Sequence, residues 1–127
     1  MPTKTKGELE AEVSQAVIRF EKEYMGRGPL ETRTFLVDDL VLVRLKGVLT
    51  AAEHKLAAAP DAERGRDLIK QVRQQLIESG GPLLHAAVKD ILGVGVRSMH
   101  TDISTRTGER VIVFTLDSRP EYDLPQK

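Results

Sequence analysis

The sequence predicts an α+β fold, in which two β-hairpins form a four-stranded antiparallel sheet with helices packed on one face. Two kinds of segment predict this class. Apolar residues recur at helical intervals over 6–25 and again over about 61–91. Two pairs of short runs rich in β-branched and aliphatic residues each surround a turn. The resulting order is helix, hairpin, two helices, hairpin, which is most simply satisfied by a sheet with helices on one side.

The first helix is predicted over residues 6–25. Thr5 and Glu8 have the spacing of a capping box, in which each residue satisfies a free backbone N–H of the other. A helical series of apolar residues follows: Leu9, Val13, Ala16, Val17, Phe20 and Tyr24. The segment 25–29, with Gly26 and Pro29, ends the helix, since glycine accepts the left-handed conformation that closes helices.

The first hairpin joins predicted strands at 32–37 and 40–45 through a tight turn at Asp38 and Asp39. Its second strand has no polar residue in the run Leu40, Val41, Leu42 and Val43. Because a strand exposed on one face normally alternates with polar residues, we expect both faces of this strand to be covered. Either the strand lies mid-sheet with a helix on one side and a partner chain on the other, or it forms part of a dimer interface, so these four residues are predicted interface residues.

Two helices are predicted next. Thr50 and Glu53 repeat the capping-box spacing and begin a short helix that reaches about residue 59, before Pro60. A longer helix follows, with six apolar residues in one helical phase: Leu68, Val72, Leu76, Leu83, Ala87 and Ile91. This phase continues across the segment 79–82, which holds Gly80, Gly81 and Pro82, so we favour one helix kinked at Pro82 over two helices joined by a loop.

The second hairpin is predicted from strands at about 96–103 and 110–116, joined by a polar turn over 104–109. No linker divides the chain, so we predict a single domain over 1–127 with an ordered core of about 6–117 and a loose tail over 118–127. The segments DLVLVRL and ERVIVFTL occupy corresponding places in the two hairpins, a weak internal duplication.

Composition excludes several classes of function. The 127 residues contain no cysteine, which excludes disulfides and thiolate chemistry and makes the cytoplasm the default compartment. No secretory signal and no run of about 18 apolar residues is present, so we expect no membrane insertion. Nineteen basic side chains balance nineteen acidic ones along the chain, and aromatic residues make up only 4%, so we expect no nucleic-acid binding.

The densest polar cluster lies on the second hairpin. The residues singled out as candidate ligand contacts are His100, Asp102, Thr105, Arg106, Thr107 and Arg110. His100 and Asp102 share one face of a strand, as a metal pair or a base and its orienting carboxylate would. Arg106 and the turn hydroxyls have the chemistry that holds a phosphate or carboxylate. We favour a solvated hairpin face for the first pair and a locally capped loop for the turn.

No residue pattern supports catalysis. His54 and His85 lie on separate predicted helices without metal-ligand spacing, and no serine or threonine sits in a nucleophile motif. Asp38 and Asp39 are interpreted as turn formers, because adjacent carboxylates at a hairpin tip are solvated. We therefore expect neither an enzyme nor a metal or other cofactor.

Three segments, FEKEYMGRGP, VDDLVLVRLKGVLTAAE and HTDISTRTGERVIVFTL, make the chain resemble the MpsC-like family, first catalogued as a domain of unknown function. The resemblance runs from about Gly7 to Asp117. The family takes its name from a component of a Na⁺-translocating, membrane-potential-generating system. The resemblance implies an accessory subunit of a membrane ion-transport or inorganic-carbon-uptake system, peripheral to the membrane and bound through a partner. A more helix-compatible pair than Gly80 and Gly81 is expected in relatives.

Three hypotheses follow. The leading one is a non-enzymatic regulatory or accessory module, cytoplasmic and homodimeric, that docks on a membrane-protein partner. The second is a sensor in which Arg106 and the threonines of the turn bind a small anion or a nucleotide. The third is a metal-dependent hydrolase that uses His100 and Asp102.

Overall fold

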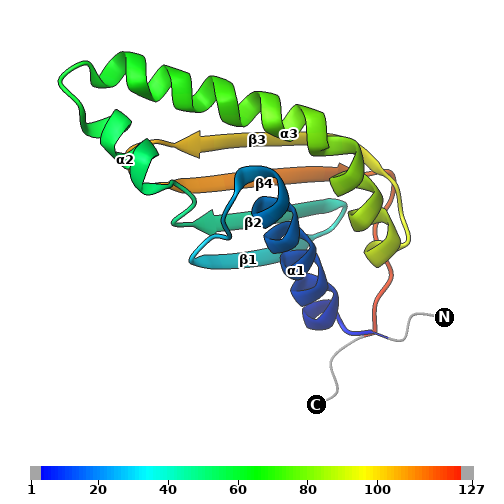
Figure 1. Ribbon diagram of the computed structural model, residues 1–127. Helices are drawn as coiled ribbons and strands as arrows, with labels where there is room; N and C mark the ends of the chain where they lie inside the picture. Colours follow the sequence, from blue (N-terminus) through cyan, green and yellow to red (C-terminus); the bar gives the residue numbers. More distant parts are fainter. Residues whose placement is uncertain (1–3, 124–127) are drawn as a thin grey trace.

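The computed structural model describes residues 4–123, and it confirms the predicted α+β fold (Figure 1). Within that range, three helices and four strands follow one another in the predicted order. They are α1 (Lys6–Met25), β1 (Glu31–Val37), β2 (Leu40–Lys46), α2 (Ala51–Ala58), α3 (Ala62–Leu92), β3 (Val96–Ser104) and β4 (Glu109–Leu116).

The four strands form one antiparallel sheet in the order β1-β2-β4-β3. The hairpins β1–β2 and β3–β4 therefore lie side by side, and their second strands pair with each other in the centre. Leu42 on β2 is paired with Val113 on β4, for example. The two segments that the sequence shows as a weak duplication are thus the two central strands of the sheet.

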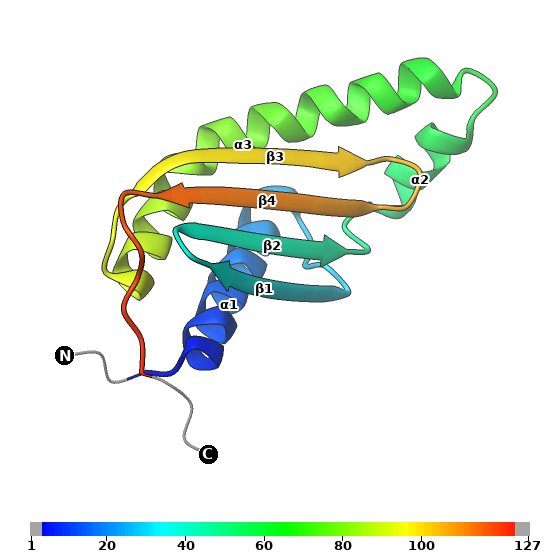
Figure 2. The same cartoon turned by 180° about the vertical axis from the view of Figure 1, so that it is seen from behind.

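The helices lie on one face of this sheet, and the opposite face carries no helix in the described chain (Figures 1 and 2). Every second residue of β2 and β4 points to the helices. These side chains and the inward faces of α1 and α3 form the core, whose fully buried members include Val13, Val17, Val41, Val43, Leu45, Ile77, Val88, Ile112 and Phe114. The fold therefore has two layers.

Local signals in the sequence place the element ends correctly. Both predicted capping boxes are present, at Thr5 with Glu8 and at Thr50 with Glu53. Gly26 ends α1 in the left-handed conformation, with φ 86°. Asp38 adopts φ 55° in the tight turn of the first hairpin, a conformation that aspartate tolerates better than most residues.

The long helix α3 is continuous across Gly80, Gly81 and Pro82, as predicted, and it bends in its C-terminal half (Figure 1). The close approach of α1 explains why residue 80 is a glycine. A Cβ atom there would overlap with the ring of Phe20 and would lie 3.2 Å from Cδ1 of Tyr24. Gly80 therefore marks the place where α3 crosses α1 at close range.

The buried face of α3 differs from the apolar phase that the sequence pattern favoured. Leu68, Val72 and Leu83 of that phase are exposed by 45%, 56% and 61%. The face that packs inward is instead formed by Gly65, Ile69, Arg73, Ile77, Gly80, Gly81, Leu84, Val88 and Leu92. Three glycines and an arginine break its apolar pattern, so the neighbouring phase looked more hydrophobic in the sequence.

The start of the predicted tail lies against the beginning of the chain. The backbone N–H of Asp123 donates to the carbonyl of Lys4 at 2.8 Å, and Pro120 is buried. A loose tail was expected over 118–127; in its described part Pro120 is buried, whereas Ser118, Arg119, Glu121 and Asp123 are exposed. Residues 124–127 of that predicted tail lie outside the described residues.

Candidate functional site

The candidate ligand residues on the second hairpin do not come together at one place. His100 and Asp102 lie on the sheet face away from the helices, where both are exposed. Arg106 and Thr107 are exposed in the turn, while Thr105 is 8% exposed. The remaining residue, Arg110, is 2% exposed and points to the helix side.

The backbone donors of the turn are used within the protein. The N–H of Thr107 donates to Oγ of Ser104 at 3.2 Å, and the N–H of Gly108 donates to the Ser104 carbonyl at 2.8 Å. The N–H of Glu109 donates to Oγ1 of Thr107 at 3.3 Å. This local capping is the arrangement favoured from the sequence, and it uses three backbone N–H groups of the turn within the protein.

His100 and Asp102 share a face, but each has its own contacts. Nε2 of His100 lies 3.4 Å from Oγ of Ser98. Oδ1 of Asp102 accepts a hydrogen bond from the N–H of Ile103 and lies 3.7 Å from Nζ of Lys70. Across residues 4–123, no three His, Asp or Glu side chains gather closely enough to hold a metal ion.

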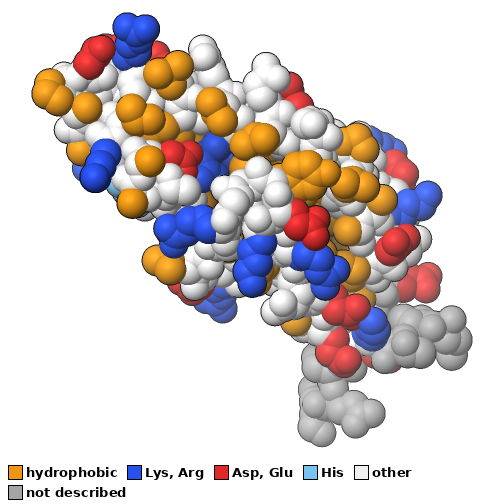
Figure 3. Space-filling model, in the orientation of Figure 1, with side chains coloured by type: hydrophobic (Ala, Val, Ile, Leu, Met, Phe, Trp, Pro, Cys, Tyr) orange, Lys and Arg blue, Asp and Glu red, His pale blue; other side chains and the backbone are white. Residues whose placement is uncertain are grey.

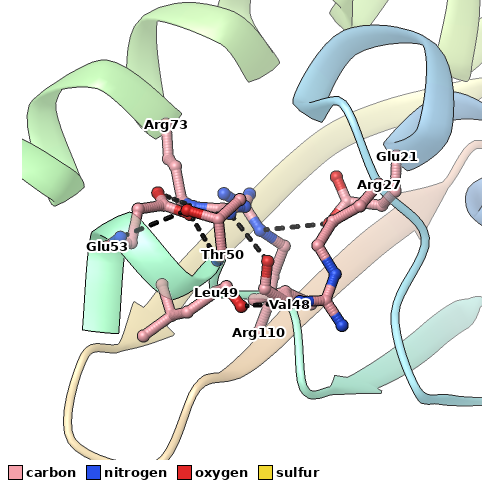
Figure 4. A network of polar contacts seen from close by, with 8 residues as sticks. All are labelled: Glu21, Arg27, Val48, Leu49, Thr50, Glu53, Arg73 and Arg110. Carbon is pink, nitrogen blue, oxygen red and sulfur yellow. Dashed lines mark hydrogen bonds and ion pairs between the residues drawn. The ribbon is translucent and has the colours of Figure 1, made fainter. Parts of the chain in front are cut away.

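Arg110 belongs to a buried charge cluster of four residues, Glu21, Glu53, Arg73 and Arg110 (Figure 4). They come from α1, α2, α3 and β4 respectively. Glu21, Arg73 and Arg110 are exposed by only 1%, 3% and 2%. Buried charges are tolerated when they are paired, and this cluster holds two of each sign.

Arg73 and Glu53 form the tightest pair of the buried charge cluster. Nε and Nη2 of Arg73 donate to the two carboxylate oxygens of Glu53 at 2.8 and 2.7 Å. Nη2 also donates to the carbonyl of Val48 at 2.8 Å. Because Glu53 also accepts from the N–H of Thr50 at 2.9 Å, one carboxylate both caps α2 and binds α3.

Arg110 and Glu21 are paired more loosely. Nε of Arg110 lies 4.0 Å from Oε1 of Glu21, and Nη1 donates to Oγ1 of Thr101 at 3.1 Å. Three buried atoms of the buried charge cluster find no hydrogen-bond partner among the described residues: Oε2 of Glu21, Nη1 of Arg73 and Nε of Arg110. A cavity of about 40 Å³ beside Arg73 and Arg110 has room for about one water molecule.

The sequence did not predict this cluster, because only the capping role of Glu53 has a local signal and Glu21 and Arg73 have none. The sequence does contain a signal for Arg110. This residue occupies the same every-second-residue positions of β4 as Ile112, Phe114 and Leu116 and therefore shares their inward face. An arginine in phase with three core residues indicates a buried charge that needs a partner.

The two glutamates of the cluster have opposite pKa shifts. Burial raises the pKa of Glu21, and the charges of Arg110 and Arg73 offset only part of this effect. Burial also acts to raise the pKa of Glu53, but hydrogen bonds from Arg73 and Thr50 outweigh it and hold this pKa below its ordinary value. Burial lowers the pKa of Arg110.

We expect Glu21→Gln and Glu53→Gln to change the pH dependence of stability in opposite ways. A raised folded-state pKa stabilises fully below the ordinary value of about 4.3, and this stabilisation is lost as pH rises through the folded pKa. Relative to the unsubstituted protein, Glu21→Gln should therefore gain stability as pH rises above that value. Glu53 has a lowered pKa, so its stabilisation is present above pH about 4.3 and is lost as pH falls further. Relative to the unsubstituted protein, Glu53→Gln should therefore lose stability as pH rises through this acidic range. Urea unfolding across acidic to neutral pH measures both differences, and slopes of the same sign would contradict the assignment.

The second candidate site is the outer sheet face, the side of the sheet that carries no helix (Figure 2). Its centre is apolar, because the outward positions of β1, β2 and β4 hold Phe35, Val37, Leu40, Leu42, Val111 and Val113. Phe35, Val37 and Leu40 are exposed by 38%, 54% and 37%. Contiguous exposed apolar surface of this kind marks interaction sites.

The predicted interface residues divide between the two faces of β2. Leu40 and Leu42 belong to the outer sheet face. Val41 and Val43 are fully buried under the helices of their own chain, so they are not available to a partner. The expectation that helices cover one face of this central strand is therefore met, and its other face is uncovered within residues 4–123.

Charged side chains surround the apolar centre of the outer sheet face. Arg44 pairs with Glu109 at 2.6 Å, and Lys46 lies 3.7 Å from Glu31. Arg33 stacks over the ring of Phe35, with 5.5 Å from Cζ to the ring centroid. Among the described residues, no carboxylate lies within ion-pair distance of Arg33.

Hydrophobic side chains are also spread over the helix side of the molecule (Figure 3). Those exposed most on α2 and α3 are Leu56, Leu68, Val72 and Leu83. In the part of the chain that the structure describes, no helix has a long enough apolar stretch to cross a membrane.

These features define a small two-layered α+β protein whose sheet is open on one side and whose helices are joined by buried charges. The chain belongs to the MpsC family. The family model, described as "Na⁺-translocating membrane potential-generating system (MpsC)", matches residues 5–118 and confirms the resemblance found in the sequence.

Two relatives from Bacillus subtilis (strain 168) match over most of their length. "Uncharacterized protein YbcI" is 42% identical over 121 residues, which cover 95% of each chain. "Uncharacterized protein YrhF" is 25% identical over 109 residues, 85% of this chain and 87% of the relative. No solved structure matches.

Proposed function

We propose that the protein is a non-enzymatic accessory subunit of a Na⁺-translocating, membrane-potential-generating system and that it acts through protein–protein contacts. The family description supports the association with such a system. The observation that carries the proposed mode of action is the outer sheet face, whose apolar centre is uncovered in the described chain. In this proposal the protein lies on the cytoplasmic side, and a membrane-protein partner supplies the ion path.

The site geometry favours this role over the binding of a small ligand. The turn of the second hairpin uses three of its N–H groups locally. The cavity beside the buried charge cluster is about 40 Å³, too small for a nucleotide. The outer sheet face, by contrast, is broad and apolar with charges around it, the usual organisation of a protein interface.

The test is the Na⁺-dependent part of the membrane potential in cells of a native host that lack the gene. A potential-sensitive dye should report a smaller Na⁺-dependent potential than in unmodified cells. The protein supplied in trans should restore it, and Leu42→Glu, which places a carboxylate at the centre of the outer sheet face, should not. Leu83→Glu makes the same change at a position on α3 that is 61% exposed and serves as the control. An unchanged potential in cells without the gene would exclude the proposal.

A further inference from the structure

We propose that the outer sheet face binds the same face of a second copy of this chain, with the two-fold axis of the dimer parallel to the strands. This inference rests on the proposed function only in that both assign the face to protein contacts. The occupant is a second copy, and the strand pairing determines which residues meet across the interface.

The strand pairing arranges the outward side chains in rows that cross the sheet. One row holds Phe35, Leu42, Val113 and His100, in the order of strands β1, β2, β4 and β3. The next row toward the turn of the second hairpin holds Arg33, Arg44, Val111 and Asp102. The row beyond it includes Lys46 on β2 and Glu109 at the start of β4.

A two-fold axis parallel to the strands and between β2 and β4 leaves each row in place and reverses its order. Leu42 then lies against Val113 of the second copy, and Leu40 lies against its Thr115. The apolar centre of one face covers the apolar centre of the other. The strand axes of the two sheets are nearly aligned, which is the common packing of two sheets about 10 Å apart.

The same operation brings opposite charges together. Arg33 at one end of its row meets Asp102 of the second copy, whose side chain is 84% exposed and lies 3.7 Å from Lys70 of its own chain at the edge of the sheet. Lys46 meets Glu109 of the second copy in the same way. Symmetry repeats each contact, so the interface gains these pairs twice. Arg33, which has no carboxylate within ion-pair distance among the described residues, obtains one.

The alternative two-fold axis, perpendicular to the strands, places each strand against the same strand of the second copy. Wherever this axis lies along the strands, Arg33 on β1 stays away from Asp102 on β3 of the second copy. The pairing of Arg33 with Asp102 therefore selects the axis parallel to the strands.

The face is close to the lower size limit of a specific dimer interface. Four strands about 4.8 Å apart and seven residues long, at about 3.3 Å per residue, span roughly 19 by 23 Å, or about 440 Å² in projection. Two such faces give about 900 Å² before the contours of the side chains are added, close to the lower limit of about 1,000 Å² and below the roughly 1,200–2,000 Å² of most stable interfaces. The helices lie on the other side of the sheet and do not obstruct the approach (Figure 2).

The test is the oligomeric state of the purified full chain, measured by sedimentation velocity over a range of concentrations. The unsubstituted protein should be a dimer and Leu42→Glu a monomer. Arg33→Asp and Asp102→Arg, which each place like charges against one another across the interface twice, should each weaken dimerisation by about tenfold or more. A far-UV circular dichroism spectrum equal to that of the unsubstituted protein would show that these substitutions leave the fold intact.

Mixing the two charge variants gives the decisive result. In a heterodimer of Arg33→Asp with Asp102→Arg, both charged contacts join opposite signs again, so the mixture should form a dimer that neither variant forms alone. Arg33 and Asp102 lie on opposite edge strands of one chain, about 14 Å apart at the usual strand spacing, so rescue requires contact between copies.

Three outcomes would overturn the dimer: a monomeric unsubstituted protein, single charge variants that dimerise as tightly as it does, or a mixture that forms no heterodimer. A monomer whose Leu42→Glu variant still loses the Na⁺-dependent potential would assign the face to a different protein. A dimer in a protein whose loss leaves the potential unchanged would retain this inference and exclude the proposed function.

Discussion

Arg73→Met should lower the free energy of unfolding by about 3–5 kcal/mol, because it removes one partner from a buried ion pair. The substitution deletes the hydrogen bonds that Arg73 donates to Glu53 and to the carbonyl of Val48. That carbonyl then loses its side-chain donor, and the largely buried carboxylate keeps only the N–H of Thr50. Methionine fills a similar volume, so the loss reports the charge and its hydrogen bonds more than a cavity. Urea unfolding at neutral pH and fixed protein concentration measures the change.

Arg119→Met is the matched control for this experiment. Arg119 also lies near a carboxylate, at 3.8 Å from Oδ1 of Asp38, but its side chain is 69% exposed. Exposed ion pairs contribute only about 0–1 kcal/mol, since water solvates either ion when the other is removed. The same chemical change should therefore cost several times less at position 119 than at position 73. Equal losses would show that burial does not govern the strength of the Arg73 contacts.

Gly80→Ala should destabilise the protein by about 1–3 kcal/mol, the usual cost of forcing an extra carbon atom into a packed core. The added Cβ would overlap with the ring of Phe20. That ring stacks on Tyr24 with 4.8 Å between centroids, so it has little freedom to move aside. Alanine favours a helix over glycine by about 1 kcal/mol, which offsets part of this cost.

Gly81→Ala provides the comparison one residue further along the same helix. Its added Cβ would have Cε of Met99 as its nearest neighbour, at 3.7 Å, an ordinary contact. The gain in helix propensity is then unopposed, so the variant should be as stable as the unsubstituted protein or more stable by up to about 1 kcal/mol. Chemical unfolding of the two variants separates close helix crossing from propensity, and equal effects would exclude the crossing as the reason for Gly80.

Strands, turns and caps could be predicted because their signals are local. Thr5 with Glu8 and Thr50 with Glu53 satisfy backbone groups only three residues away, so their spacing is sufficient evidence. The alternation along β4 and the two aspartates at 38 and 39 likewise act within a few residues. These elements appear in the structure within a residue or two of their predicted limits.

The buried charge cluster and the phase of α3 depend on contacts between distant segments. Glu21 and Arg110 are separated by 89 positions, and no local sequence signal near either residue indicates the other as its partner. By helix propensity alone, Gly80 is unfavourable in α3, and its role follows only from the ring of Phe20 beside it. Because the inward face of α3 uses glycine for close approach and Arg73 for charge pairing, hydrophobicity alone identified the wrong phase.

The position of β4 determines when the protein can become folded during synthesis. This strand is the last of the four in the chain, yet it lies between β2 and β3 in the sheet. Until residues 109–116 leave the ribosome, β2 has an unpaired edge and β3 has no neighbour, and Glu21 lacks Arg110. Such long-range pairing slows folding and leaves apolar strands open to wrong association. A nascent chain that ends before residue 109 should therefore remain sensitive to protease, and folding should be completed only after translation of the last strand.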